Sequence, residues 1–398
     1  MEELILGELT ERKIGYGIIQ PGESTIGGVP VIKVNNIISG LKSIQDLDTT
    51  HPENDQKYRK TRLNGGEIII SVVGTIGKTA IVPMDFKGCN LVRATALIDI
   101  KDPILSRWVK YYIDSPKGQS YINGNLNTTV QPTLNIKSLV EMPIPFYGRE
   151  YAEKVVAILS KIDDKIENNR KINDNLEQQA QALYKSWFVD FEPFKDGEFF
   201  ESEFGLIPEG WRVGALSDLT EITMGQSPSG KSYNETGDGM LFYQGRAEFG
   251  DRYPSIRLYT TEPSRIAEQN SVLLSVRAPV GDTNIAYNKC CIGRGLASIK
   301  AKHGFNSFIF YMVKSLKDQF DLYNGEGTVF GSINRDSLNS MKVIVPTNDV
   351  ISDFEKIVAP LDFKYKSLFT ENLLLTQQRD TLLPKLMSGE LKINEIDC

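Results

Sequence analysis

The residues best placed to do chemistry form a glycine-rich turn that ends in a lysine, Gly74-Thr-Ile-Gly77-Lys78-Thr79. A nucleotide-binding P-loop ends in the same way, because its backbone amides and its lysine hold the phosphates. That motif also requires a glycine five positions before Gly77, and Val72 stands there. We therefore interpret the segment as a turn between two strands, and we expect no nucleotide site in it.

Metal, redox and covalent chemistry have even less support. Cys89, Cys290, Cys291 and Cys398 form no CxxC pair and only two histidines are present, so we expect neither a zinc site nor a disulfide framework. The chain has no GxSxG nucleophile elbow. It also lacks the Asn-Pro-Pro-aromatic tetrapeptide with which adenine methyltransferases act on a flipped base. These absences favour a binding protein that is not catalytic by itself and holds no metal.

The charge of the chain bears on whether it could bind nucleic acid. The net charge is −6, but residues 1–150 carry 17 Lys and Arg against 16 Asp and Glu. Much of the acidic excess lies in residues 151–200 and 350–398, and no region is strongly basic. Because non-specific DNA affinity comes from neutralising phosphates, we expect tight DNA binding only together with a basic partner.

The sequence also bears on the compartment. No apolar run approaches the roughly 18–20 residues that a membrane span needs. The N-terminal residues lack the apolar core of a signal peptide. We therefore expect a cytoplasmic protein that does not contact a membrane.

The elements that would position binding residues occur twice along the chain. The matches are residues 71–81 with 275–285 at an offset of 204, Arg93 with Arg294 at 201, and Asn135 with Asn334 at 199. Small changes of offset are what loop insertions and deletions produce, and the order of the matches never reverses. We therefore predict two copies of one domain.

A helical pattern follows each copy, at residues 151–191 and 350–391. Apolar and asparagine positions recur at alternating spacings of three and four, which is a heptad seam with polar breaks. The seam residues are Leu159, Ile162, Ile166, Asn169, Asn173, Leu176, Leu183, Leu361, Leu368, Asn372, Leu375 and Leu382. The asparagines favour pairing of the two helices over packing on separate cores, because a polar seam residue fixes register. We expect Pro360 to kink the second helix or delay its start.

The predicted fold class is α+β, with two tandem domains of curled β-sheet separated by two long antiparallel, coiled-coil-like helices. Predicted strands cover 29–34, 67–73, 271–276 and 341–345, and predicted helices cover 104–113 and 305–320. The expected bounds are 1–148 for the first domain, 149–192 for a spacer helix, 193–210 for a linker, 211–347 for the second domain and 348–398 for a distal helix. The first spacer helix would be on the order of 50 Å long, which exceeds one DNA turn of ~34–36 Å.

Several longer motifs are specific enough to identify a family. They are LEQQAQALYKSWFVDFEPF at 176–194, GLIPEGWRV at 205–213, GQSP at 225–228, YQG at 243–245, SVRAPVGD at 275–282, CIGRGLA at 291–297 and LLPKLMSGEL at 382–391. They resemble the conserved regions and one recognition-domain class of type I restriction–modification specificity subunits. The resemblance implies that each domain reads half of a bipartite double-stranded DNA site and that the helices dock two modification subunits. Two restriction (motor) subunits would join, and S-adenosylmethionine, ATP and Mg²⁺ would be bound by the partner subunits.

Candidate DNA contacts follow from side-chain chemistry. Arg and Lys read guanine, Asn and Gln read adenine, and Ser, Thr and Lys hold phosphates. In the first domain the candidates are Lys33, Asn35 and Asn36 in the loop after the 29–34 strand, with Thr75, Lys78, Arg93, Thr128, Gln131 and Asn135. In the second domain they are Gln226, Ser227, Lys231, Tyr243, Gln244, Arg246, Arg277, Arg294 and Asn334. Those in shared motifs could instead hold the domain's own loops together.

Two further questions stay open from the sequence. Trp187, Phe188 and Phe191 could be exposed anchors for a modification subunit, or core residues against the neighbouring domain. The whole chain could also be a stand-alone nuclease or methyltransferase, or a protein-only scaffold on a coiled coil. Activity of the chain alone would identify the first alternative, and partner binding without DNA would identify the second.

Overall fold

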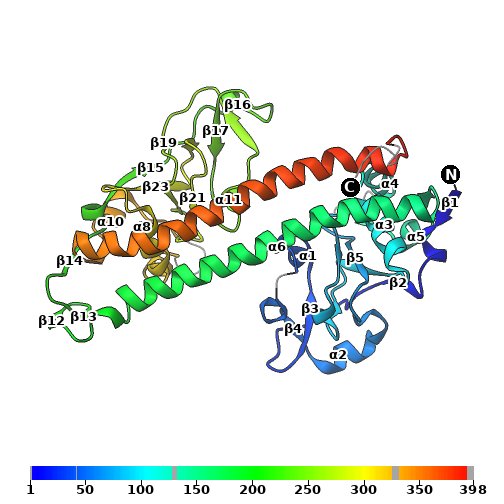
Figure 1. The fold of residues 1–398 in the computed structure, drawn as a ribbon, viewed down its shortest axis with the longest axis horizontal. Helices are drawn as coiled ribbons and strands as arrows, with labels where there is room; N and C mark the ends of the chain where they lie inside the picture. The colour runs from blue at the N-terminus through cyan, green and yellow to red at the C-terminus, as the bar shows by residue number, and fades with distance from the viewer. Residues whose placement is uncertain (1, 42, 128–131, 325–330, 392–398) are drawn as a thin grey trace. The chain divides into compact units, whose positions relative to one another are not determined.

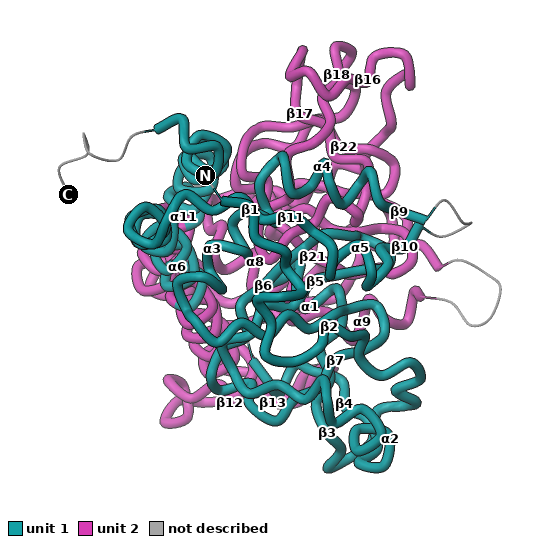
Figure 2. Tube along the Cα trace, turned by 90° about the vertical axis from the view of Figure 1, so that its right-hand side faces the viewer, with its two compact units in different colours: residues 1–171, 369–398 teal, residues 172–368 magenta. Residues whose placement is uncertain are grey.

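The computed structural model describes residues 2–41, 43–127, 132–324 and 331–391 (Figure 1). The chain forms two compact units, residues 1–171 with 369–398 and residues 172–368 (Figure 2). Two helices of 40 residues each, α6 (Arg149–Phe188) and α11 (Asn348–Met387), contribute a part to both units. No helix among the described residues has the length and apolarity needed to cross a lipid bilayer.

The first unit is built on a four-stranded antiparallel sheet in the order β2-β8-β5-β6. Its strands are β2 (Arg12–Tyr16), β8 (Thr95–Asp99), β5 (Ile68–Ser71) and β6 (Thr79–Ile81). A smaller sheet has the order β4-β3-β7, with β3 parallel to β7. The other strands and the helices are β3 (Val29–Ile32), β4 (Thr49–Thr50), β7 (Asn90–Leu91), β1 (Glu2–Ile5) paired with β11 (Pro143–Phe146), β9 (Leu126–Asn127) paired with β10 (Thr133–Leu134), α1 (Val34–Ser39), α2 (Pro52–Lys57), α3 (Pro103–Asp114), α4 (Pro116–Gly124) and α5 (Ile136–Val140).

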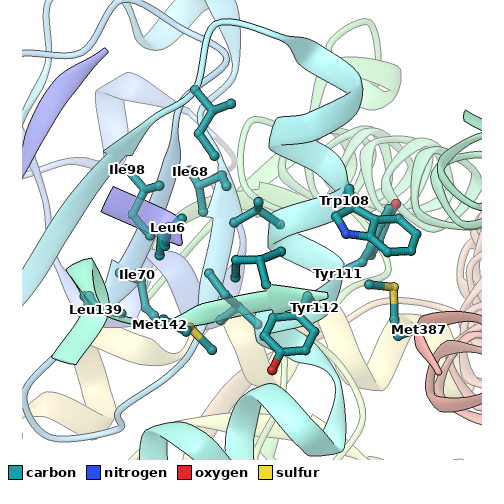
Figure 3. Close-up of a cluster of buried hydrophobic side chains, with 14 of the residues drawn as sticks. Leu6, Ile68, Ile70, Ile98, Trp108, Tyr111, Tyr112, Leu139, Met142 and Met387 are labelled. Carbon is teal, nitrogen blue, oxygen red and sulfur yellow. The ribbon is translucent and has the colours of Figure 1, made fainter. Parts of the chain in front are cut away.

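Strand β5 shows how one sheet supports two cores. Its sequence, Ile-Ile-Ile-Ser, is buried throughout. Because side chains alternate along a strand, Ile68 and Ile70 enter the larger core with Trp108 of α3 (Figure 3), whereas Ile69 enters a smaller one. Met387 of α11 belongs to the larger core as well. The first domain is therefore completed by residues from the other end of the chain.

The second unit repeats this topology. Its four-stranded sheet has the order β15-β23-β20-β21, and its other sheet contains β17 parallel to β22. The elements are β14 (Arg212–Ala215) paired with β24 (Lys342–Val345), α7 (Leu216–Leu219), β15 (Thr220–Met224), β16 (Tyr233–Asn234), β17 (Met240–Tyr243), β18 (Leu258–Thr260), β19 (Ile266–Ala267), β20 (Val272–Ser275), β21 (Thr283–Ile285), β22 (Cys290–Ile292), β23 (Leu296–Ala301), α8 (Asn306–Ser315), α9 (Lys317–Asp321) and α10 (Arg335–Asn339). The predicted duplication of one α+β domain is confirmed, since each strand of the first sheet has a counterpart in the same order.

Helices α6 and α11 pair antiparallel within each unit. In the first unit the Tyr151 hydroxyl of α6 donates to the Leu386 carbonyl of α11 at 2.8 Å, and Asn169 Nδ2 donates to Asn372 Oδ1 at 2.9 Å. In the second unit Phe188 of α6 packs on Phe354 of α11, with ring centroids 5.0 Å apart. All twelve predicted seam residues are buried or half-buried.

Three local expectations need correction. Helix α11 begins at Asn348, so Pro360 does not delay it. Pro360 lies on the exposed face of the helix, where water can satisfy the carbonyl that loses its amide partner. The predicted helix at 305–320 is divided into α8 and α9 at Leu316. The 193–210 segment contains a β-hairpin, β12 (Phe199–Ser202) with β13 (Gly205–Pro208).

The aromatic residues at the end of α6 pack internally. Phe188 is buried against Phe308 and Phe354. Phe191 lies beyond the helix end and packs on Trp211, with ring centroids 5.5 Å apart. Of the two alternatives left open by the sequence, Phe188 is therefore a core residue that packs against the neighbouring domain and is not an exposed anchor.

Replacement of Pro360 by alanine should stabilise the protein. Pro360→Ala restores one backbone hydrogen bond in a continuous helix, so the free energy of unfolding should rise by about 1–3 kcal/mol. Thermal unfolding of the purified chain measures the effect. Pro103, in the first turn of α3, is the matched control, because proline suits that position. An unchanged or lower melting temperature for Pro360→Ala would show that the proline is accommodated without cost.

Candidate nucleic-acid interface

The ends of four strands meet on one side of the second domain. The Gly225 amide after β15 donates to the Leu296 carbonyl at 2.9 Å, and the Gln226 amide donates to the Ile292 carbonyl at 3.0 Å. The Gly293 amide after β22 donates to the Tyr243 carbonyl of β17 at 2.8 Å. These backbone bonds bring three loops together, although the loops lie up to 70 residues apart in the sequence.

The glycines of these loops are required by close backbone approach. A Cβ atom on Gly225 would lie 2.1 Å from the Gly293 carbonyl oxygen, and one on Gly293 would lie 2.8 Å from the Gln244 carbonyl oxygen. Any side chain at these positions would separate the loops. The shared GQSP, YQG and GRG motifs therefore hold the loops together through their backbone.

The side chains of the same loops remain available to a ligand. Gln226, Gln244, Arg277 and Arg294 are exposed. Arg277 follows β20, and it joins the group because the Val276 amide donates to the Gly295 carbonyl at 3.0 Å. We call these four residues the second reading face. Their chemistry suits DNA, since Arg reads guanine and Gln reads adenine.

Four other candidates in the second domain differ from this group. Ser227 is half-buried and its hydroxyl accepts the Arg294 amide at 3.4 Å, so it supports the loops. Arg246 is exposed but forms an ion pair with Asp282, which offsets its charge. Lys231 is exposed in a short 3-10 helix at 230–232. Asn334 caps α10, where its Oδ1 accepts the Ser337 amide at 2.8 Å.

Among the candidates that the structure describes, Tyr243 is the one whose side chain is buried. Its side chain is 1% exposed and packs with Leu273 and Ile292. Burial raises the pKa of the hydroxyl above its ordinary value. The expected DNA contact is therefore wrong for this residue, because β17 directs the ring into the core and leaves Gln244 at the surface.

The first domain assembles the corresponding loops with the same backbone bonds. The Gly17 amide after β2 donates to the Thr95 carbonyl at 3.2 Å, and the Ile18 amide donates to the Leu91 carbonyl at 2.7 Å, as the Gly225 and Gln226 amides do to Leu296 and Ile292 in the second domain. Arg93 is exposed, as are Thr75 and Lys78 in the turn between β5 and β6. We call Thr75, Lys78 and Arg93 the first reading face.

The P-loop-like segment is the predicted strand-connecting turn. Gly74 and Gly77 have φ of 79° and 81°, values that glycine adopts easily. The Ser71 hydroxyl accepts the Lys78 amide at 2.9 Å. In the second domain the Ser275 hydroxyl accepts the Asp282 amide at 2.9 Å. The same serine therefore closes the turn in both copies, with or without a lysine.

Residues 33–36 form the start of a helix and not the expected loop. Lys33 caps α1, its amide donates to Asn36 Oδ1 at 2.7 Å, and its Nζ lies 2.5 Å from Asp48. Ile37 is buried and anchors the helix. Asn36 is therefore used in the cap, whereas Asn35 is exposed.

The remaining first-domain candidates are a helix cap and two residues outside the described ranges. Asn135 Oδ1 accepts the Lys137 amide at 2.9 Å, which matches the role of Asn334 in the second domain. Thr128 and Gln131 lie outside the described residues.

Two exposed residues of the first domain were not among the DNA contacts predicted from the sequence. Ile19 and Gln20 are exposed in the loop after β2, where the second domain has the GQSP loop. The signal was present in the sequence, because Gly17-Ile-Ile-Gln-Pro21 matches Gly225-Gln-Ser-Pro228 with one residue more. Gln20 is the glutamine of that loop.

Groups for other chemistry are not gathered in the part of the chain that the structure describes. Cys89, Cys290 and Cys291 are buried free thiols. Burial raises the pKa of Cys89 to about 11 and that of Cys290 to about 12, so both stay protonated at neutral pH. Within the described ranges no group of three or more His, Cys, Asp and Glu side chains is placed to hold a metal.

Comparison with known proteins identifies relatives along nearly the whole chain. A family model described as the type I restriction modification DNA specificity domain matches residues 2–178 and 208–358. The "Putative type I restriction enzyme MjaX specificity subunit" of Methanocaldococcus jannaschii is 31% identical over 378 residues, which cover 92% of this chain and 88% of that protein. The type I restriction enzyme HindI specificity subunit of Haemophilus influenzae is 27% identical over 335 residues, covering 65% of this chain and 71% of that protein. A crystal structure of a type I restriction–modification system S subunit from M. genitalium is similar in fold, with a TM-score of 0.55 at 16% identity, and covers 97% of this chain and 95% of that one.

Loss of an arginine from either reading face should weaken DNA binding. For Arg93→Ala or Arg294→Ala we expect lower affinity, and, if the lost contact is to phosphate, a slope of log K against log salt that is shallower by about 0.9. Binding is measured with the complex of this chain and its partner subunits over a range of salt. Lys300→Ala is the matched control, because Lys300 is exposed near the opposite end of β23 from Arg294 and is paired with Glu221. Equal losses for the control and the arginines would contradict this assignment of the face.

Proposed function

This chain belongs to the family of type I restriction–modification DNA specificity subunits, and we propose that each of its two domains reads one half of a bipartite DNA site. The observation that carries the proposal is the duplication of the loop arrangement. The same backbone bonds, Gly17 to Thr95 and Gly225 to Leu296, assemble loops at the same strand ends in both domains. Two similar domains suit two half-sites better than one continuous site.

The two reading faces differ in side chains although their frames are alike. Lys78 in the first domain corresponds to Asp282 in the second, whereas Arg93 corresponds to Arg294. Base edges are distinguished by the donors and acceptors presented to them. The two half-sites should therefore differ in sequence, while the contacts made by the equivalent arginines should be similar.

The two helices supply the docking surface for two modification subunits. Phe363 and Leu374 on α11 are 76% and 57% exposed, and large apolar side chains in such positions often mark protein interfaces. The modification subunits would bind S-adenosylmethionine and methylate one adenine in each half-site. Two restriction subunits would use ATP and Mg²⁺ to cleave unmodified DNA in the cytoplasm. This chain contributes recognition and no catalytic group.

Exchange of one domain tests the proposal. Replacing residues 1–145 with the corresponding domain of another specificity subunit should change one half-site of the methylated sequence and leave the other unchanged. Sequencing of methylated adenines in host DNA, with and without the exchanged gene, measures both halves at once. The reciprocal exchange of residues 211–347 should change only the other half.

Three outcomes would contradict the proposal. Retention of the original full site after the first exchange would show that the first domain does not read DNA. A change of both half-sites after a single exchange would show that the domains do not read independently. Binding of partner subunits without any dependence of methylation on this chain would favour the scaffold alternative.

A further inference from the structure

A partly buried carboxylate in the first unit joins three elements. Asp163 of α6 accepts the Tyr111 hydroxyl of α3 at 2.9 Å and Arg379 Nη1 of α11 at 3.1 Å, and Lys110 Nζ of α3 lies 3.5 Å away. The Asp163 side chain is 23% exposed. Burial alone would raise the pKa of Asp163, but Lys110 and Arg379 lower it below its ordinary value. The carboxylate is therefore ionised and holds the domain, α6 and α11 together.

In the second unit a buried guanidinium joins the domain to α6 and α11. Arg252, from the loop after β17, is 2% exposed. Its Nη1 donates to Glu177 Oε2 of α6 at 2.9 Å, and its Nη2 donates to Asp362 Oδ1 of α11 at 2.5 Å. The guanidinium also lies 4.7 Å from the ring centroids of Phe310 and Tyr365. A cation from the domain is thus held between carboxylates of the two helices, which reverses the charges of the first unit.

A hydrogen bond from a tyrosine to an aspartate is present in both units, although the charges around it are reversed. The Tyr311 hydroxyl of α8 donates to Asp362 at 2.9 Å, as Tyr111 of α3 does to Asp163. The tyrosines lie 200 positions apart and the aspartates 199, which agrees with the offsets of the repeat. In each copy a tyrosine of the domain therefore binds an aspartate of the helix that follows the domain in sequence.

The rest of the contact between the first domain and its helix is mostly apolar. Trp108 of α3 packs in one cluster with Val155, Val156 and Leu159 of α6. Apolar burial stabilises the contact but has little directional preference, whereas a hydrogen bond to an ionised group constrains both distance and angle. The tyrosine–aspartate bonds therefore add direction to this contact in both copies, beside the Arg149–Asp102 ion pair in the first unit and the bond from the Phe308 amide to Glu355 Oε1 in the second.

We propose that Tyr111 with Asp163 and Tyr311 with Asp362 are positioning pairs, which set the angle of each reading domain on its helix and thereby the spacer length accepted between the two half-sites. This inference rests on the proposed bipartite reading. It predicts that loss of a pair changes the spacing that is tolerated, while the bases that are read stay the same.

Removal of a single hydroxyl tests the proposal. Tyr111→Phe and Tyr311→Phe keep the rings and remove the hydrogen bonds. The matched controls are Tyr121→Phe and Tyr233→Phe, because these hydroxyls donate within their own domains, to the Ser138 and Pro228 carbonyls at 3.0 Å. Each variant is assembled with the modification subunits and given a library of duplexes that carry both half-sites and differ in spacer length by single base pairs.

The expected result is a loss of spacer discrimination. The ratio of methylation at the preferred spacer to that at one base pair more or less should fall by about fivefold for Tyr111→Phe and Tyr311→Phe, with the same half-site sequences. The ratio should stay unchanged in the two controls. An unchanged ratio in both pair variants, or an equal fall in the controls, would overturn the positioning role. A wild-type complex that methylates without two half-sites would instead overturn the bipartite reading.

A measurement on the chain alone tests positioning without partner subunits. Lys117→Cys in α4 and Lys161→Cys in α6 place two spin labels at exposed positions, and Cys398→Ser removes the C-terminal thiol that would also be labelled. The two labels report the distance between the first domain and its helix. The distance distribution should broaden in Tyr111→Phe and not in Tyr121→Phe. Identical distributions in wild type and Tyr111→Phe would overturn the proposal for the first domain, whatever the methylation assay shows.

Discussion

The antiparallel pairing of α6 with α11 is the constraint on which the rest of the structure depends. In the first unit Asn169 Nδ2 donates to Glu371 Oε2 at 2.7 Å and to Asn372 Oδ1 at 2.9 Å, and Asn372 Nδ2 donates to the Ile166 carbonyl at 3.2 Å. The Oδ1 atoms of Asn169 and Asn173 are buried without a hydrogen-bond partner in the described structure, so this polar crossing carries a cost. Its benefit is register, because a slip along the seam would leave these amides unpaired in an apolar contact.

The pairing also completes the first domain. The Tyr147 hydroxyl donates to the Ser388 carbonyl at 2.9 Å, across 241 positions of sequence, and Leu386 and Met387 are buried in the core around Trp108. A globular domain at one end of the chain is thus closed by residues from the other end. The same helix therefore serves both as core and as frame, which is why a change in α11 can affect the first domain without touching its sheet.

The two copies share the same backbone arrangement of loops but differ in the side chains that these loops carry. Gly17 and Gly225 begin equivalent loops, and Asn135 and Asn334 cap equivalent helices. Lys78 is exposed, and Asp282 at the equivalent position is half-buried and paired with Arg246 and Lys317, so the same frame carries opposite charges in the two copies. A recognition surface built in this way can change what it reads while the fold and the attachment to the helices are preserved.

The sequence by itself determined the duplication, the two long helices and the strands β3, β5, β20 and β24, because these depend on local periodicity and on motifs long enough to align. It also located the loops of the reading faces, and the missed Gln20 was within reach of the same alignment. Only the tertiary structure decided which candidates face outward. The Tyr243 side chain points into the core, and Arg246 forms an ion pair with Asp282. The side chains of Asn36, Asn135 and Asn334 accept hydrogen bonds from nearby backbone amides. It also revealed Asp163, Arg252 and Asp362 as partners, since such contacts join residues more than 50 positions apart and leave no periodic trace in the sequence.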